Sequence, residues 1–207
     1  MTTTLKMAER IQQLLRCPRC RSTLSLTETD LRCTNAACGI QFPVIGGVPI
    51  LVNEAASLFR IADFVEGRPT TFPASERLIK TIVKLIPSVT LNLDSGRNYV
   101  WLAQQFRRLS PTPKVLVIGG SVLGQGMEAL LAEGSIELIE TDVALGQRTH
   151  LVCDAHDIPF EDGAFDGIIA QAVLEHVVDP YRCVDEIHRV LNDMSPINWS
   201  SRNVRIR

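Results

Sequence analysis

The sequence predicts an α/β fold in which a parallel sheet of about four strands follows a small metal-binding module. From Lys114 onward, short apolar strands alternate with helical segments, and this alternation is typical of a parallel sheet with crossover helices. Ahead of that region, four cysteines stand in two pairs, a pattern typical of a metal site in a small module. The length of 207 residues suits one ordinary domain and a small second module.

The composition is that of a globular protein, and the charge is distributed unevenly. Hydrophobic residues make up 45% and charged residues 21%, and the net charge of −2 gives no overall attraction to nucleic acid or anionic membranes. Residues 1–110 carry 14 basic and 8 acidic side chains, residues 111–193 carry 4 and 15, and the tail adds three arginines. The two halves are therefore expected to be different modules.

The sequence favours a cytoplasmic location. No stretch approaches the roughly 20 apolar residues that cross a bilayer, and residues 1–16 contain no secretory apolar core. In a reducing compartment, the six cysteines are expected to be metal ligands or free thiols rather than a disulfide framework.

The elements of the first half follow from periodicity and turn residues. They are a helix over 4–16, a strand over 23–27, a hairpin over 42–52 that turns at Gly46–Gly47, a linker with a helical start over 53–73, and helices over 74–86 and 97–109.

The second half reads as strands over 115–118, 136–139, 149–153 and 165–170, with helices over 127–132 and after Asp179. Asp179 is expected to cap the last helix, with Pro180 at its first position. The apolar stripe of that helix is expected to contain Tyr181, Val184, Ile187, Val190 and Leu191.

Four of the six cysteines have the spacing of a structural zinc site. Two residues separate the first pair and four separate the second, which suits tetrahedral Zn²⁺ with four sulfur ligands. About 35 residues cannot bury enough apolar surface to fold alone, so a bound metal would supply the missing free energy. The alternative is four unrelated thiols. The expected ligands are Cys17, Cys20, Cys33 and Cys38, while Cys153 and Cys183 are expected to be small apolar residues of a strand and a helix.

The cysteine region resembles the small zinc ribbons of the Trm112-like methyltransferase activators. The resemblance covers residues 11–52 and includes Leu15-Arg-Cys-Pro-Arg-Cys20, the second cysteine pair and Phe42-Pro-Val-Ile-Gly-Gly-Val-Pro-Ile-Leu51. It implies that a fused ribbon supports a methyltransferase in the same chain. Four arginines of this region form either a solvated basic face or a nucleic-acid surface; these are Arg16, Arg19, Arg21 and Arg32.

Polar and glycine residues follow the predicted parallel strands at their carboxyl ends, where open α/β sheets bind ligands. A glycine-rich turn follows the first strand and allows close approach of a ligand. Asp142 ends the second strand, where a carboxylate can accept the hydroxyls of a ribose. Asp154 and Ala155 follow the third strand, and Gln171 follows the fourth.

This region resembles the class I S-adenosylmethionine-dependent methyltransferases, specifically their type 11 branch. The matching pieces lie within residues 114–191 and include Asp154-Ala155, Ile158-Pro-Phe160 and Val173-Leu-Glu-His176, although Val117 replaces the acidic residue usual in the first strand. The resemblance implies a Rossmann-like parallel sheet in strand order 3-2-1-4, with S-adenosyl-L-methionine as cofactor. It further implies that Gly119, Gly120 and Gly124 approach the methionine part, Asp142 the ribose, Asp154 and Ala155 the adenine, and Gln171 the transfer centre.

The sequence identifies no catalytic base and no methyl acceptor. His176 is either a proton acceptor or a locally packed residue, while His156 and His188 are expected to be exposed. The acceptor can be a small molecule, a lipid, RNA or a protein. Alternatives to the methyltransferase are a non-catalytic adaptor that binds a partner protein or RNA, and a nicotinamide-dependent oxidoreductase. The Asp154-Ala155 step and the lack of a compact G-x-G-x-x-G count against the oxidoreductase.

The last 16 residues contain no strand or helix pattern. We therefore expect a truncated methyltransferase sheet, with impaired activity and an open fourth strand through which chains can associate. The expected division is a helix and zinc ribbon over 1–53, a linker and helices over 54–110, the N-terminal half of a class I methyltransferase domain over 111–191, and an irregular tail over 192–207.

Overall fold

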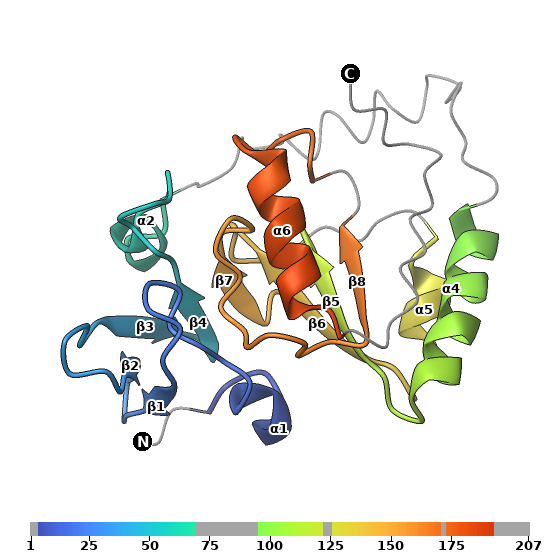
Figure 1. Cartoon of the computed structure of the whole chain (residues 1–207), viewed down its shortest axis with the longest axis horizontal. Coiled ribbons are helices and arrows are strands. Elements are labelled where there is room, and N and C mark those ends of the chain that lie inside the picture. The colour runs from blue at the N-terminus through green and yellow to red at the C-terminus, as the bar shows by residue number, and fades with distance from the viewer. Residues whose placement is uncertain (1–3, 69–94, 122–125, 171–172, 193–207) are drawn as a thin grey trace.

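A computed structural model describes residues 4–68, 95–121, 126–170 and 173–192 of the chain. These residues form a single mixed sheet of eight strands in the order β1-β2-β3-β4-β7-β6-β5-β8 (Figure 1). The first four strands come from the cysteine module and the last four from the predicted parallel sheet. None of the helices in the described ranges has the length and apolarity that a membrane crossing requires.

The parallel sheet has the predicted strand order. Its strands are β5 (Lys114–Ile118), β6 (Glu137–Asp142), β7 (Leu151–Cys153) and β8 (Gly167–Ala170). Central β5 pairs in parallel with β6 on one side and β8 on the other, and β6 pairs with β7. In chain order these strands are arranged 3-2-1-4, so the expected Rossmann-like topology is confirmed. Within the described ranges, β8 forms one edge of the sheet, as expected.

The cysteine module forms two antiparallel hairpins and then joins the parallel sheet. Its strands are β1 (Leu24–Leu26), β2 (Asp30–Cys33), β3 (Gln41–Ile45) and β4 (Val48–Leu51). The hairpin that turns at Gly46–Gly47 is confirmed. At Gly47 the φ angle is +83°, and a Cβ would lie 2.9 Å from the Thr4 carbonyl oxygen, so this position requires glycine.

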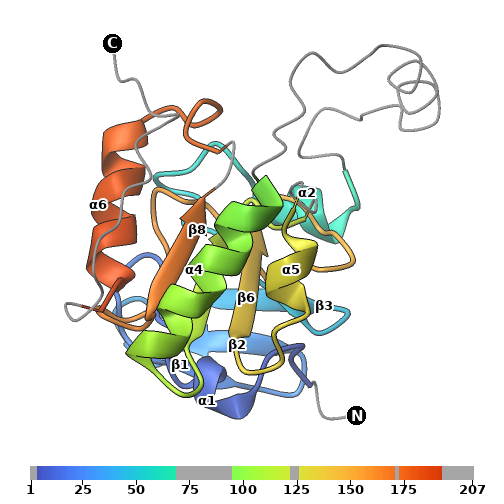
Figure 2. The ribbon, with the colours of Figure 1, turned by 90° about the vertical axis from the view of Figure 1, so that its right-hand side faces the viewer.

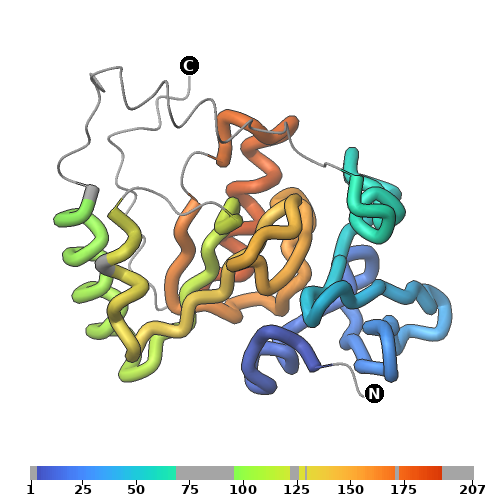
Figure 3. The backbone as a smooth tube through the Cα atoms, turned by 180° about the vertical axis from the view of Figure 1, so that it is seen from behind, coloured from blue at the N-terminus to red at the C-terminus, as the bar shows by residue number. Residues whose placement is uncertain are grey.

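Two strand features were not predicted. The strand β2 was missed, although its side chains alternate between buried and more exposed positions. The parallel pairing of β4 with β7, through Ile50–Val152 and Leu51–Cys153, was also missed. This pairing makes the cysteine module an extension of the parallel sheet, and Figure 3 shows the N-terminal part of the chain beside β7. The described part of this module, residues 4–53, is called the ribbon below.

The described helices are α1 (Glu9–Gln12), α2 (Ile61–Val65), α4 (Ser95–Leu109), α5 (Glu128–Leu131) and α6 (Pro180–Val190). The helix expected over 4–16 is reduced to α1, because Leu15 and Arg16 make antiparallel bridges with Phe160 and Thr23. The helix expected over 74–86 lies outside the described residues. Asp179 caps α6 as predicted, since its carboxylate accepts the Arg182 amide.

The apolar stripe expected on α6 was partly wrong. Tyr181 is 65% exposed and Val184 is half-buried, whereas Cys183, Ile187 and Val190 are buried. The buried side chains repeat at spacings of four and three residues, as a helix packed on one face requires. Cys183 therefore takes the core position that the sequence analysis gave to Tyr181.

Helices cover both faces of the parallel sheet, and alternate side chains of β5 contact them. Val115 and Val117 share a core with α4 and α5, while Leu116 and Ile118 share a core with α6. Figures 1 and 2 show α4 and α5 on one face and α6 on the other. The core beside α6 also contains apolar residues of the ribbon, which are Leu5, Met7, Ile11, Leu15, Leu31, Phe42 and Leu51. Ribbon and sheet therefore share one hydrophobic core.

Candidate functional site

The four predicted zinc ligands come together. Their sulfur atoms all lie within 4.8 Å of one another, with 3.8 Å between Cys17 and Cys38 and 3.4 Å between Cys20 and Cys33. A tetrahedron of sulfur atoms around Zn²⁺ at about 2.3 Å has edges of about 3.8 Å. The cluster therefore has the donor set and the size that a structural zinc ion needs.

The turns around the cysteines set different environments for the thiols. Burial raises the pKa of Cys17 to about 12, whereas the hydrogen bond with the Ser22 side chain lowers the pKa of Cys20 to about 6. The first turn closes when the Arg21 amide donates to the Cys17 carbonyl at 2.9 Å. Arg21 has a φ angle of +61°, a left-handed conformation that is uncommon outside glycine.

A second candidate site lies at the carboxyl ends of the parallel strands. Gly119 and Gly120 follow β5, and their amides both donate to the Thr141 carbonyl on β6. A Cβ on Gly120 would lie 2.9 Å from the Cβ of Glu140, so no side chain fits there without movement. The next residue after them, Ser121, donates its amide to Asp142 Oδ2 at 2.9 Å. The glycine turn and Asp142 therefore form one compact unit.

Asp154 and Ala155 follow β7, next to this unit, and both are buried. The Ser57 hydroxyl donates to Asp154 Oδ2 at 2.5 Å, and the His156 amide and Nδ1 contact Asp154 Oδ1 at 3.0 and 2.5 Å. Burial alone would raise the pKa of Asp154, but the hydrogen bonds from Ser57 and His156 lower it below its usual value. The carboxylate is therefore charged at neutral pH.

The histidines differ from the sequence expectation in one case. His156 was expected to be exposed, but its side chain is only 14% exposed because it lies between Asp154 and the amide of Asp179. His188 is exposed as expected. His176 is also exposed, and its amide donates to the Val173 carbonyl. Gly124 and Gln171 lie outside the described residues.

Two arginines of the ribbon bind the second half of the chain. Arg21 donates to the Ile158 carbonyl and to Glu186 Oε2, both at 2.8 Å. Arg16 forms an ion pair with Glu161. Neither of the two alternatives for the arginine cluster, a solvated face or a nucleic-acid surface, describes these two residues. The sequence carried no signal for the pairs, because each joins residues more than 140 positions apart.

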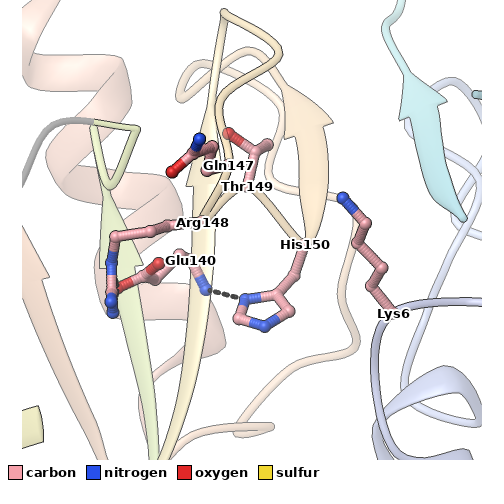
Figure 4. A pocket seen from close by; sticks show the side chains of 6 residues that line it. All are labelled: Lys6, Glu140, Gln147, Arg148, Thr149 and His150. Atoms are coloured by element: carbon pink, nitrogen blue, oxygen red, sulfur yellow. Dashed lines mark hydrogen bonds and ion pairs between the residues drawn. The ribbon is translucent and has the colours of Figure 1, made fainter. Parts of the chain in front are cut away.

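A pocket of about 260 Å³ lies between the ribbon and the loop that joins β6 to β7 (Figure 4). Its lining residues are Lys6, Glu140, Gln147, Arg148, Thr149 and His150. Glu140 is 1% exposed and pairs with Arg148 through Oε1, while Oε2 has no hydrogen-bond partner among the described residues. Burial raises the pKa of Glu140 although Arg148 lowers it in part. No motif or spacing in the sequence pointed to this pocket.

Comparison with known proteins finds one family that part of the chain is similar to. Residues 121–194 match the family model described as a methyltransferase domain. The matched segment begins at Ser121, whose amide bonds Asp142, and ends after α6. It therefore includes Asp142, Asp154 and Ala155.

One curated protein is similar to about half of the chain. The chain is 27% identical over 112 residues to the demethylmenaquinone methyltransferase of Clavibacter sepedonicus. The aligned region covers 48% of this chain and 46% of that protein. The chain therefore spans about half the length of this relative.

Two solved structures show similarity over comparable parts of the chain. The YcgJ protein of Bacillus subtilis is 23% identical over 46% of this chain and 47% of its own, with a TM-score of 0.36. A chain from the complex between the Haloferax volcanii Trm112 methyltransferase activator and a putative methyltransferase is 21% identical over 48% of this chain and 50% of its own, with a TM-score of 0.34.

Proposed function

We propose that this chain binds S-adenosylmethionine at the carboxyl ends of β5, β6 and β7 and transfers its methyl group to an acceptor. The observation that carries the proposal is the position of Asp142 and Asp154. Asp142 ends β6 and Asp154 follows the neighbouring parallel strand β7, inside the segment that matches the methyltransferase family. Open α/β sheets bind nucleotides at this edge.

The hydrogen-bond acceptors at this edge suit the hydroxyl and amine groups of the cofactor. Asp142 uses Oδ2 to accept the Ser121 amide, which leaves Oδ1 as an acceptor for the ribose hydroxyls. Asp154 offers a buried carboxylate to the exocyclic amine of adenine, with Ala155 beside the base. We propose in addition that Gly119, Gly120 and Gly124 bind the methionine part and that Gln171 acts near the transfer centre.

The residues contribute mainly binding and orientation. The bound cofactor supplies an electrophilic methyl group on its sulfonium. The protein then has to align a nucleophile behind that methyl group and exclude water, which accelerates transfer without a dedicated acid or base. We assign no residue as a base. The acceptor is a small molecule, a lipid, RNA or a protein, and we propose that transfer takes place in the cytoplasm.

A calorimetric titration with S-adenosylhomocysteine tests this proposal. The chain is expected to bind this product, and Asp142→Ala is expected to weaken binding at least tenfold because the bound diol would lose a charged acceptor, worth about 1.5–3 kcal/mol. Asp166→Ala, at a carboxylate on the opposite end of the sheet near Lys114, serves as the control. Zinc-loaded, folded protein that binds neither S-adenosylhomocysteine nor S-adenosylmethionine would contradict the proposal and favour a non-catalytic adaptor.

We also propose that Cys17, Cys20, Cys33 and Cys38 hold a structural Zn²⁺ in a Trm112-like ribbon. Four sulfur ligands complete a tetrahedron and leave no position for substrate, so the metal would stabilise the fold rather than take part in transfer. Metal analysis of the purified chain is expected to give one zinc per molecule, and Cys33→Ser is expected to lose it. A full complement of zinc in the Cys33→Ser variant would contradict this ligand set.

A further inference from the structure

The segment that connects the ribbon to α2 runs along the candidate cofactor site. After β4 ends at Leu51, Asn53 donates its side-chain amide to Asp157 Oδ2 at 3.2 Å, and Ser57 donates to Asp154 Oδ2. Further on, Glu54 Oε1 accepts the Ile61 amide at the start of α2. Hydrogen bonds thus hold the segment at both ends. They place Ser57 against Asp154, the residue expected to contact the adenine.

The hydroxyl of Ser57 donates to Asp154. The two oxygen atoms lie 2.5 Å apart, and a charged carboxylate can only accept, so the single hydroxyl proton lies on this contact while the Ser57 oxygen accepts the Phe59 amide at 3.2 Å. A serine hydroxyl has one proton, and a carboxylate has about four acceptor positions over its two oxygens. The Ser57 hydroxyl therefore occupies one of the two acceptor positions on Asp154 Oδ2.

His156 fills the other oxygen of the same carboxylate. Its Nε2 accepts the Asp179 amide at 3.1 Å, which leaves the ring proton on Nδ1, directed to Asp154 Oδ1. The His156 amide reaches the same oxygen. Among the described residues, these three donors leave one acceptor position, on Oδ2 beside Ser57. One position is what a single N–H of an exocyclic amine needs.

We propose that Ser57 is a positioning residue for nucleobase recognition: it orients Asp154 so that one acceptor position faces the exocyclic amine of adenine. This inference rests on the proposed function, because it names how the same site distinguishes an aminopurine from an oxopurine. The segment that follows the ribbon would thereby contribute a residue to the cofactor site of the second half of the chain. Ser57 itself acts through Asp154 and does not touch the base.

Titration of S-adenosylhomocysteine and of its deaminated analogue S-inosylhomocysteine into zinc-loaded full chain tests the proposal. Ser57→Ala is expected to weaken S-adenosylhomocysteine binding about fivefold, the equivalent of one hydrogen bond, and to leave binding of the inosyl analogue unchanged. Ser57→Thr keeps the hydroxyl and is expected to restore affinity to within about twofold. Ser25→Ala removes a hydroxyl that bonds the Arg32 carbonyl within the ribbon, and is expected to change neither affinity.

A second measurement requires no ligand. Carboxyl ¹³C NMR of the unliganded protein is expected to show a higher pKa for Asp154 in Ser57→Ala, because the variant lacks a hydrogen bond that lowers it.

Three results would overturn the inference. They are unchanged or tighter binding of S-adenosylhomocysteine to Ser57→Ala, equal losses for both ligands, and an unchanged pKa of Asp154. Failure of the wild-type chain to bind S-adenosylhomocysteine would instead refute the proposed function, so the two failures are distinguishable.

Discussion

At Arg21 the backbone and the side chain favour different residues. The left-handed φ angle of +61° favours glycine, since this conformation costs other residues about 1–2 kcal/mol. The guanidinium, however, bonds Glu186 Oε2 and the Ile158 carbonyl, both on the other half of the chain. An arginine at this position therefore exchanges local backbone strain for a contact between the two halves.

Paired substitutions separate these two effects. Arg21→Ala keeps the strained angle and loses the contacts, so the free energy of unfolding is expected to fall by about 1–2 kcal/mol, a modest value because the side chain is partly exposed. Arg21→Gly loses the same contacts but relaxes the turn, so its loss is expected to be smaller. Urea unfolding of zinc-loaded protein measures both, with exposed Arg32→Ala as the control. A glycine variant less stable than the alanine variant would contradict this account.

The residues that sequence reasoning found are those with local or spacing signals. The cysteine quartet, Asp142 and Asp154 stood out because ligand spacing and strand ends are visible in the chain. Ser57 carried no such signal, since its bond to Asp154 joins residues 97 positions apart. His156 was misjudged as exposed for the same reason: the amide that covers it belongs to Asp179.

At the scale of elements, prediction succeeded where one strand or helix is stabilised by its own pattern. The strands β5 to β8 and the helix α6 follow from apolar runs, glycines and the Asp179 cap. The helix expected over 4–16 is shorter than predicted because Leu15 and Arg16 form antiparallel bridges with Phe160 and Thr23 in place of a further helical turn. The pairing of β4 with β7 depends on which edge lies nearby, which no single strand encodes.

Glu186 on α6 holds the loop after β7 in place through hydrogen bonds. This carboxylate accepts the Ile158 amide and bonds with Arg189 and Arg21. Burial by itself raises the pKa of Glu186, but the hydrogen bonds from Arg189 and Arg21 lower it below the usual value of 4.5. The stabilising contribution is therefore complete at neutral pH and is lost as the pH falls below about 4.5 toward the lowered value.

Glu186→Gln is expected to lower the free energy of unfolding by about 1–2 kcal/mol at pH 7, because a neutral amide replaces a charged acceptor. The difference from wild type is expected to shrink as the pH falls below about 4.5, where the wild-type carboxyl group also becomes neutral. Urea unfolding of both proteins at matched pH values measures it. Exposed Glu128→Gln, on α5, is the control. A difference that is constant with pH would show that Glu186 acts through shape rather than charge.

At the scale of the whole molecule, the ribbon and the sheet cannot be treated as separate folding units. The shared core joins ribbon residues such as Phe42 and Leu51 to Leu116 and Phe160 of the second half. Two of the four clustered cysteines, Cys17 and Cys33, are themselves part of that core. Because β4 also supplies the neighbour of β7, loss of order in the ribbon exposes a sheet edge next to Asp154.

Removal of the zinc that we propose is therefore expected to reach beyond the ribbon. Chelation should increase amide hydrogen exchange in β3, β4 and β7, while β5, which lies between β6 and β8, keeps more of its protection. The melting temperature of the whole chain should fall in a single transition, because one core serves both halves. Chelation of a Cys33→Ser variant controls for effects of the chelator itself. Unchanged exchange in β7 alongside an unfolded ribbon would show that the two halves are energetically independent, and that Ser57 does not depend on the metal to reach Asp154.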